Sequence, residues 1–207
     1  MTIETTKNDS TEQSQMLVDR TEYLTSGVHI GMKTCTKYMK QFVYKIRDDG
    51  LAVFNIQKVD DRVKVAAEFL SRFDKIMVVS RKGNGTLPIK KFADVVDGKA
   101  VTGRFPPGTL TNPSFKNFYE PDVLVVVDPL IDKQVIIEAK KKRIPIVALC
   151  DTFNEGNDVD FVIPANNNGK KSLALIFWIL AREISKNKKK IKGNDEFKSE
   201  LKEFLGE

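Results

Sequence analysis

The chain has 207 residues and a formal net charge of +6 at pH 7, and 41% of its residues are hydrophobic. This length and composition exclude a disordered or fibrous chain and favour a globular protein with a sizeable core. The two cysteines, Cys35 and Cys150, lack a metal-type spacing, which predicts reduced thiols in a cytoplasmic protein. The most apolar stretch, 173–181, is too short to span a bilayer, so we expect no membrane partner. The excess of positive charge favours an acidic partner.

The sequence divides into three parts by composition. Residues 1–16 are polar and predict a disordered N-terminal arm. Residues 17–186 are expected to form a single α/β domain. Residues 187–207 are expected to form a basic linker and a short amphipathic helix.

The elements of the central domain follow from hydrophobic periodicity. Alternating side chains between residues 42 and 56, with Asp48-Asp49-Gly50 at the centre, predict a β-hairpin. After it we expect strands at 75–80, 100–105, 122–128, 144–151 and 160–164, and helices at 60–73, 87–96, 128–143 and 167–185. This alternation of strands and helices predicts a parallel sheet with right-handed crossovers.

The helix starts are predicted from residues that commonly occupy such positions. Asp60 or Asp61 is the expected N-cap of the first of these helices, and Asp132 that of the third. The second is expected to open at Pro88.

Polar residues follow several of the expected strands, at the edge where doubly wound sheets bind ligands. Asp128 and Asp151 could serve a phosphate-handling enzyme or bind a cation, and this is the alternative function. However, the sequence lacks a Gly-rich dinucleotide or P-loop motif, and both aspartates suit turn capping better. His29, the only histidine, is assigned a structural hydrogen bond, and no metal or cofactor is expected.

The basic residues indicate a different function. No acidic residue occurs from Gly27 to Arg47, where lysines are interleaved with Tyr38, Phe42 and Tyr44. Cations neutralise phosphates and aromatic rings stack on bases, although a solvated basic face with core-facing rings is an equally weighted alternative. The RNA-binding candidates are Lys33, Lys37, Lys40, Lys45, Arg47, Arg81, Lys82, Arg104, Thr109, Thr111 and Asn112.

The candidates from Arg104 to Asn112 belong to one proline-rich turn, "GRFPPGTLTN" (103–112). Arg104 offers a bidentate fork for phosphate, and the two prolines reduce the entropy lost when the loop is held. The alternative is that the threonines and the asparagine only brace the turn and that Phe105 only packs.

Five segments occur in an order that resembles a known family. They are "GVHIG" (27–31), "GRFPPGTLTNP" (103–113), "EPDVLVVVDP" (120–129), "IPIVALCDT" (144–152) and "IPANNNGKKSLALIFWILAREI" (163–184). They resemble the small-subunit ribosomal protein two family in its archaeal and eukaryotic branch, which includes the laminin-receptor precursor. The resemblance covers roughly residues 20–186. The protein is expected to be archaeal, because this sequence has no room for the bacterial helical hairpin and lacks the eukaryotic acidic extension.

The resemblance implies a flavodoxin-like three-layer fold with a central parallel sheet and no enzymatic activity. It implies a structural constituent of the small ribosomal subunit in the cytoplasm, which binds small-subunit rRNA and neighbouring ribosomal proteins late in assembly. It also implies that the assembled protein is not a homo-oligomer. The apolar stripe of Phe197, Leu201, Phe204 and Leu205 should then dock on the protein's own layers or on a neighbouring ribosomal protein. We favour the neighbour, because the linker lets the helix reach away from the core.

Overall fold

The centre of the molecule is a five-stranded parallel sheet. This computed structural model describes residues 16–189, 191, 197 and 199–206. The strands are β3 (Ile76–Ser80), β4 (Lys99–Thr102), β5 (Val123–Val126), β6 (Ile146–Cys150) and β7 (Phe161–Pro164). Their order, β4-β3-β5-β6-β7, is the flavodoxin-like order, so the expected fold is confirmed. Every residue of β3, β5 and β6 is buried, which explains their continuous apolar sequences.

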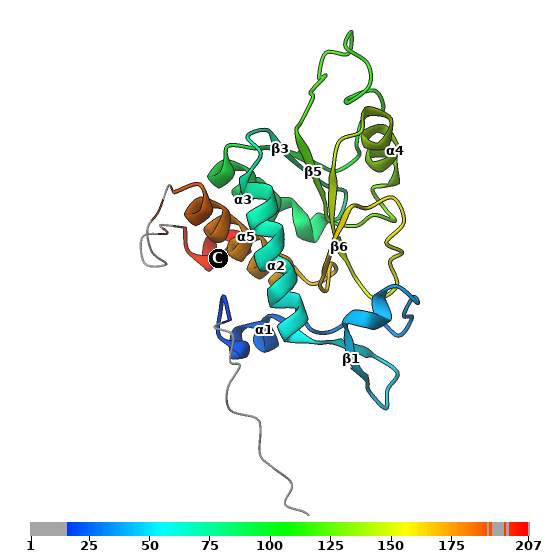
Figure 1. Cartoon of the computed structure of the whole chain (residues 1–207), viewed down its shortest axis with the longest axis vertical. Coiled ribbons are helices and arrows are strands. Elements are labelled where there is room, and N and C mark those ends of the chain that lie inside the picture. Colours follow the sequence, from blue (N-terminus) through cyan, green and yellow to red (C-terminus); the bar gives the residue numbers. More distant parts are fainter. Residues whose placement is uncertain (1–15, 190, 192–196, 198, 207) are drawn as a thin grey trace, which may run out of the picture.

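Helices cover both faces of this sheet. Helix α5 (Lys170–Asn187) packs against both α2 (Ile56–Ser71) and α3 (Thr86–Val96) on one face. Helix α4 (Lys133–Lys142) lies on the opposite side, as Figure 1 shows. The short helix α1 (Arg20–Ser26) contacts α5, and two single-turn 3-10 helices occupy Met39–Phe42 and Gly83–Gly85.

A small antiparallel hairpin precedes the sheet and projects from the domain (Figure 1). Its strands are β1 (Val43–Ile46) and β2 (Ala52–Phe54), and Gly50 in the turn has a left-handed φ of 84°. The preceding segment lies along the other side of β2, where the Gly31 amide donates to the Ala52 carbonyl at 2.8 Å. The expected hairpin is therefore confirmed.

The predicted cap of α2 is wrong. The helix begins at Ile56, and the Asn55 side chain accepts a hydrogen bond from the Gln57 amide at 3.0 Å. Asp60 lies inside the helix, where its buried carboxylate accepts from the Tyr23 hydroxyl at 2.7 Å. Asp60 is thus a residue of capping type that accepts a hydrogen bond from a tyrosine distant in the sequence and caps no helix.

The other two helix starts also differ in detail from the prediction. Helix α3 begins at Thr86, two residues before Pro88. Asp132 does occupy the N-cap position of α4, but its side chain makes no cap hydrogen bond. Its carboxylate accepts from the Arg81 amide at 3.4 Å instead, because β3 ends beside it.

The C-terminal apolar stripe packs against the protein's own helices. Helix α6 (Leu201–Leu205) contacts α3 and α5, and Phe204 is fully buried. The Trp178 ring meets Phe197 edge-on at 6.1 Å and its Nε1 donates to the Ser199 carbonyl at 2.9 Å. These contacts favour the own-layer alternative, while the docking on a neighbouring protein stays a prediction.

Two remaining expectations concern the ends of the domain. Residues 1–15 of the predicted arm, and residues 190 and 192–196 of the predicted linker, lie outside the described residues. Met16 is described and packs, partly buried, against the core. Across the described part of the chain, no helix combines the length and apolar character required to cross a bilayer.

Candidate nucleic-acid interface

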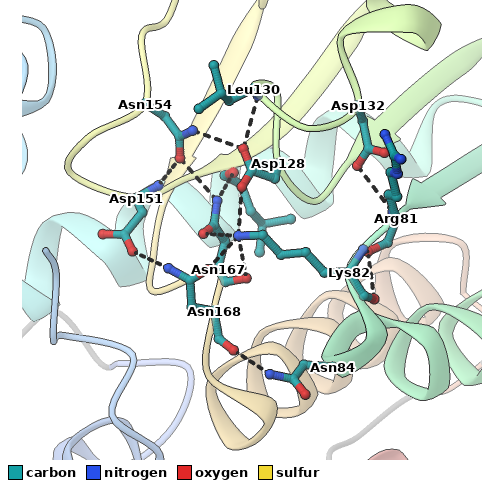
Figure 2. A network of polar contacts seen from close by, with 12 residues as sticks. Arg81, Lys82, Asn84, Asp128, Leu130, Asp132, Asp151, Asn154, Asn167 and Asn168 are labelled. Atoms are coloured by element: carbon teal, nitrogen blue, oxygen red, sulfur yellow. Dashed lines mark hydrogen bonds and ion pairs between the residues drawn. The ribbon is translucent and has the colours of Figure 1, made fainter. Parts of the chain in front are cut away.

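The edge of the sheet where this fold usually binds ligands is occupied by a lysine of the chain itself. Lys82 follows β3, and its Nζ lies 2.6 Å from Oδ2 of Asp128, which follows β5 (Figure 2). The same Nζ donates to Oδ1 of Asn167 at 2.8 Å and of Asn168 at 2.6 Å. The Asp128 side chain is 1% exposed and that of Lys82 is 12% exposed, so this ion pair is desolvated.

Amide groups satisfy the rest of this strand-end network. Oδ1 of Asp128 accepts from the Leu130 amide at 3.0 Å and from Nδ2 of Asn154 at 3.0 Å. Oδ2 of Asp128 has no hydrogen-bond partner among the described residues, so its contact is the ion pair with the Lys82 ammonium. Asp151 accepts from the Thr152 amide at 2.7 Å and from Nδ2 of Asn168 at 3.2 Å. Both aspartates therefore brace turns, as expected.

Burial controls the titration of the groups around this network. Desolvation raises the pKa of Asp132 to about 6 and also raises the pKa of Asp151. It raises the pKa of the buried Cys150 thiol to about 12, which makes this thiol a poor nucleophile. In the described ranges, no group of three or more His, Cys, Asp or Glu residues is arranged to hold a metal ion.

The two adjacent RNA-binding candidates after β3, Arg81 and Lys82, lie in different environments. The Arg81 side chain is exposed and forms no ion pair with any described residue. Lys82, also predicted to bind RNA, is engaged in the strand-end network, so this geometry favours a structural role for it. Sequence reasoning had no means of separating two adjacent cations.

The proline-rich turn folds over a buried glutamate of α4. Glu138 accepts from the amides of Gly108 at 2.8 Å and Leu110 at 3.2 Å. It also accepts from the Thr111 hydroxyl at 3.4 Å and from Nε2 of Gln134 at 2.9 Å. These hydrogen bonds hold the turn firmly on α4, because charge-assisted hydrogen bonds are stronger than neutral ones. Glu138 was missed from the sequence, where it reads as an ordinary helix residue.

This packing decides what the turn can offer to a partner. The Thr109 hydroxyl donates to the Pro106 carbonyl at 2.8 Å and Thr109 is buried, so the geometry favours the bracing alternative for Thr109 and Thr111 over the predicted RNA contact. Asn112 is exposed, although its Oδ1 also accepts from the Ser114 amide at 3.1 Å. The Arg104 side chain is exposed and pairs with no described residue. The turn therefore presents one cation and one amide on a braced support.

The basic segment 27–47 keeps its cations at the surface. Its five cationic side chains, Lys33, Lys37, Lys40, Lys45 and Arg47, are all exposed. Of the three interleaved rings, Phe42 is buried, whereas Tyr38 is 44% and Tyr44 is 71% exposed. The two alternatives for this segment thus each describe part of it. The Nδ1 atom of His29 is buried without a partner in the part of the chain that the structure describes, so its expected side-chain bond is not seen there.

Sequence comparisons with known proteins identify the family of this chain. The family described as ribosomal protein S2 matches residues 23–118 and 114–187. The chain belongs to this family. The small ribosomal subunit protein uS2 of Ignicoccus hospitalis is 52% identical over 173 residues, which cover 82% of each chain. That of Nanoarchaeum equitans is 47% identical over 190 residues, 91% of this chain and 94% of the relative. That of Thermoplasma acidophilum is 46% identical over 192 residues, 92% and 96% respectively.

Membership of the S2 family separates the two functional alternatives. The family is one of ribosomal structural proteins rather than enzymes. The phosphate-handling alternative built on Asp128 and Asp151 is not supported, because a lysine ammonium and asparagine amides occupy both carboxylates.

Proposed function

We propose that this chain is a structural constituent of the small ribosomal subunit, where it binds small-subunit rRNA and neighbouring ribosomal proteins and joins late in assembly. The observation that carries the proposal is 46–52% identity, over most of the chain, to archaeal proteins named for that subunit. In this proposed role the protein works in the cytoplasm, has no membrane partner, and is not a homo-oligomer when assembled into the subunit.

The proposed RNA contacts are the predicted residues that remain at the surface. They are Lys33, Lys37, Lys40, Lys45, Arg47, Arg81, Arg104 and Asn112. Their support is exposure and charge, since phosphate contacts supply most of the affinity for RNA and need accessible cations. Lys82, Thr109 and Thr111 leave the set because they bond within the protein.

The proposed protein-facing surface also changes. Phe204 is buried against α3 and α5, and Phe197, Leu201 and Leu205 are partly buried, which supports docking of the C-terminal stripe on the protein's own helices. Large apolar side chains stay exposed just before α4, at Leu130 and Ile131, and on α4 itself, at Ile137. Exposed apolar groups of this size suit a contact with a neighbouring ribosomal protein.

Salt dependence tests the RNA contacts. Binding of phosphates releases counterions, so affinity for small-subunit rRNA should fall steeply as salt rises. Replacing Lys33, Lys37 and Lys40 together by Ala should reduce the slope of log affinity against log salt by about two to three. The control replaces Lys64, Lys75 and Lys90, exposed lysines outside the segment, and removes the same charge.

Two outcomes would count against the proposal. An equal loss of slope in both triple variants would show that only net charge matters. If the wild-type chain fails to co-sediment with small subunits at low salt, the ribosomal role itself is wrong.

A further inference from the structure

The hairpin region exposes an unusual group of large apolar side chains beside the basic segment. The exposed fractions are 46% for Met32, 44% for Tyr38, 71% for Tyr44 and 59% for Ile46. Single exposed hydrophobic residues are common, but several within one short segment mark a contact surface, and Tyr44 and Ile46 both belong to β1. Proposed phosphate contacts alone do not explain them, because lysine and arginine suffice for that task.

Tyr44 is the most exposed of the four and has no described partner. It takes part in no hydrogen bond or ring contact with another side chain of the described residues, whereas Tyr38 packs edge-on against Phe42 at 6.2 Å. Tyr44 is also the extra residue in β1, where the pairing shifts register between Val43 and Lys45. Such a bulge re-aims a side chain, and the paired residues on either side hold its backbone in place.

The charges around Tyr44 select the kind of partner. Lys45 is its direct neighbour, and the whole stretch from Gly27 to Arg47 contains no acidic residue. Asp48 and Asp49 follow in the turn, where Asp49 pairs with Arg47 at 3.7 Å, but the five cations of segment 27–47 outnumber these two carboxylates. An anionic partner that also offers flat apolar surfaces fits this combination.

A protein strand fits less well than RNA. A bulge and a lysine on an edge strand are devices that discourage pairing with another strand, and β1 has both. Double-stranded RNA fits less well too, because its bases are stacked on one another and leave no face for a tyrosine ring. Unpaired bases offer such faces, and stacking on aromatic side chains is the usual way in which proteins hold them.

We propose that the hairpin is a stacking site for unpaired nucleotides of RNA, in which the Tyr44 ring contacts a base face. The cations of segment 27–47 hold the adjoining phosphates. This inference rests on the proposed RNA-binding function and names the form of RNA that this part of the surface takes.

The test compares two RNA probes, a 12-nucleotide oligoadenylate and a 12-base-pair RNA duplex, by fluorescence anisotropy at low salt. Tyr44→Ala should weaken binding of the single strand by roughly 10-fold, the loss expected for one stacked base, and change duplex binding less than about twofold. Tyr44→Phe, which keeps the ring, should bind as the wild type does. Val65→Ala on α2, at a side chain that is 49% exposed, is the matched surface control.

The outcomes separate this inference from the function on which it rests. If Tyr44→Ala leaves both probes unaffected, or weakens both equally, the stacking site is wrong. The rRNA salt dependence of the lysine variant would then still support RNA binding. If Tyr44→Phe loses as much affinity as Tyr44→Ala, the hydroxyl rather than the ring carries the contact and stacking is again wrong. A wild-type chain that prefers the duplex would also overturn it.

Discussion

Lys82 places a positive charge between β3 and β5, where the strand order reverses and proteins of this fold bind their ligands. The ammonium replaces a ligand as the partner of Asp128 and of the asparagines that follow β7. The pair is buried, so each side chain lacks solvent as an alternative partner. The edge where a related fold would hold a ligand is therefore closed by an ion pair that links the ends of β3 and β5.

Lys82→Met removes the charge and keeps the length of the side chain. It should lower the free energy of unfolding by about 3–5 kcal/mol, because it leaves the Asp128 carboxylate buried and unpaired. Adding Asp128→Asn should recover a large part of this loss. Urea denaturation measures both. Arg72→Ala, which breaks an exposed pair with Glu68, should cost less than about 1 kcal/mol, and an equal cost for Lys82→Met would contradict the prediction.

The Asp132 carboxyl predicts a dependence of stability on pH. Burial raises its pKa in the folded protein to about 6, above the ordinary value of 3.8. Between these two values the folded state binds more protons than the unfolded state, so the contribution of Asp132 to stability falls as pH rises from about 4 to about 6. Asp132→Asn removes this contribution, on the order of 2 kcal/mol across the window.

Denaturant unfolding at several pH values checks this prediction. The stability of Asp132→Asn should fall less, or rise more, than that of the wild type over the window. Asp94→Asn, at an exposed position of α3, controls for the loss of an acidic residue. Parallel curves for the wild type and Asp132→Asn would show that this carboxyl is not the cause.

At the scale of elements, a single glutamate on α4 shapes the segment between β4 and β5. Glu138 collects donors from the backbone of the proline-rich turn, and Phe105 and Leu110 pack beneath it. The rigidity expected from the prolines therefore has a second source, which is a charged anchor. The turn is stiff because it is bonded to a helix as well as because of its own sequence.

Glu138→Gln keeps the shape of this anchor but replaces one acceptor oxygen by an amide donor. That donor would face a backbone N–H of the turn, so we expect a loss of about 2 kcal/mol in stability. Limited proteolysis should show faster cleavage within residues 103–122. Glu120→Gln, at an exposed side chain, is the control. Unchanged cleavage in Glu138→Gln would mean that packing alone holds the turn.

Helix α6 is the other element with a decisive contact. A helix of this length is marginal alone, so burial of Phe204 against α3 and α5 must stabilise it. Phe204→Ala should lower the melting temperature by about 5 °C. Lys202→Ala, at an exposed position, should not change it. A normal melting temperature with reduced occupancy in small subunits would favour the neighbouring-protein alternative instead.

At the scale of the molecule, the exposed cations lie away from the edge of the sheet where this fold usually binds ligands. The ligand edge of the sheet is closed by the strand-end network, while exposed cations gather on the hairpin and its approach. The proposed RNA contacts lie on the surface around the sheet rather than at its ligand edge, so the fold alone would not identify the function.

Calorimetry tests the closed edge. Titration of the wild-type chain with Mg²⁺ and ATP should give no micromolar binding, because Lys82 and asparagine amides already occupy both strand-end carboxylates. Asp128→Asn and Asp151→Asn should alter folding stability only. Micromolar binding that both substitutions abolish would show that the edge accepts a ligand.

Much of the architecture could be predicted from the sequence. Buried strands such as β5 are continuous Val-rich runs, and Gly50 marks the turn of the hairpin, because backbone geometry imposes these patterns locally. The family could also be inferred, because its segments occur in order along the chain. The exposed lysines of segment 27–47 were found for the same reason, since charge runs are visible in sequence.

The partners of individual polar side chains were decided only by the tertiary structure. Asn55 and Asp60 are both capping types, and only the approach of Tyr23 assigns Asp60 to another role. Arg81 and Lys82 are adjacent cations, but only Lys82 reaches the carboxylate after β5. Likewise, the stripe that contains Phe204 has the same spacing whether it docks on its own helices or on a neighbour. Local periodicity follows from the backbone, whereas the choice of partner depends on desolvation and geometry between segments that are distant in the chain.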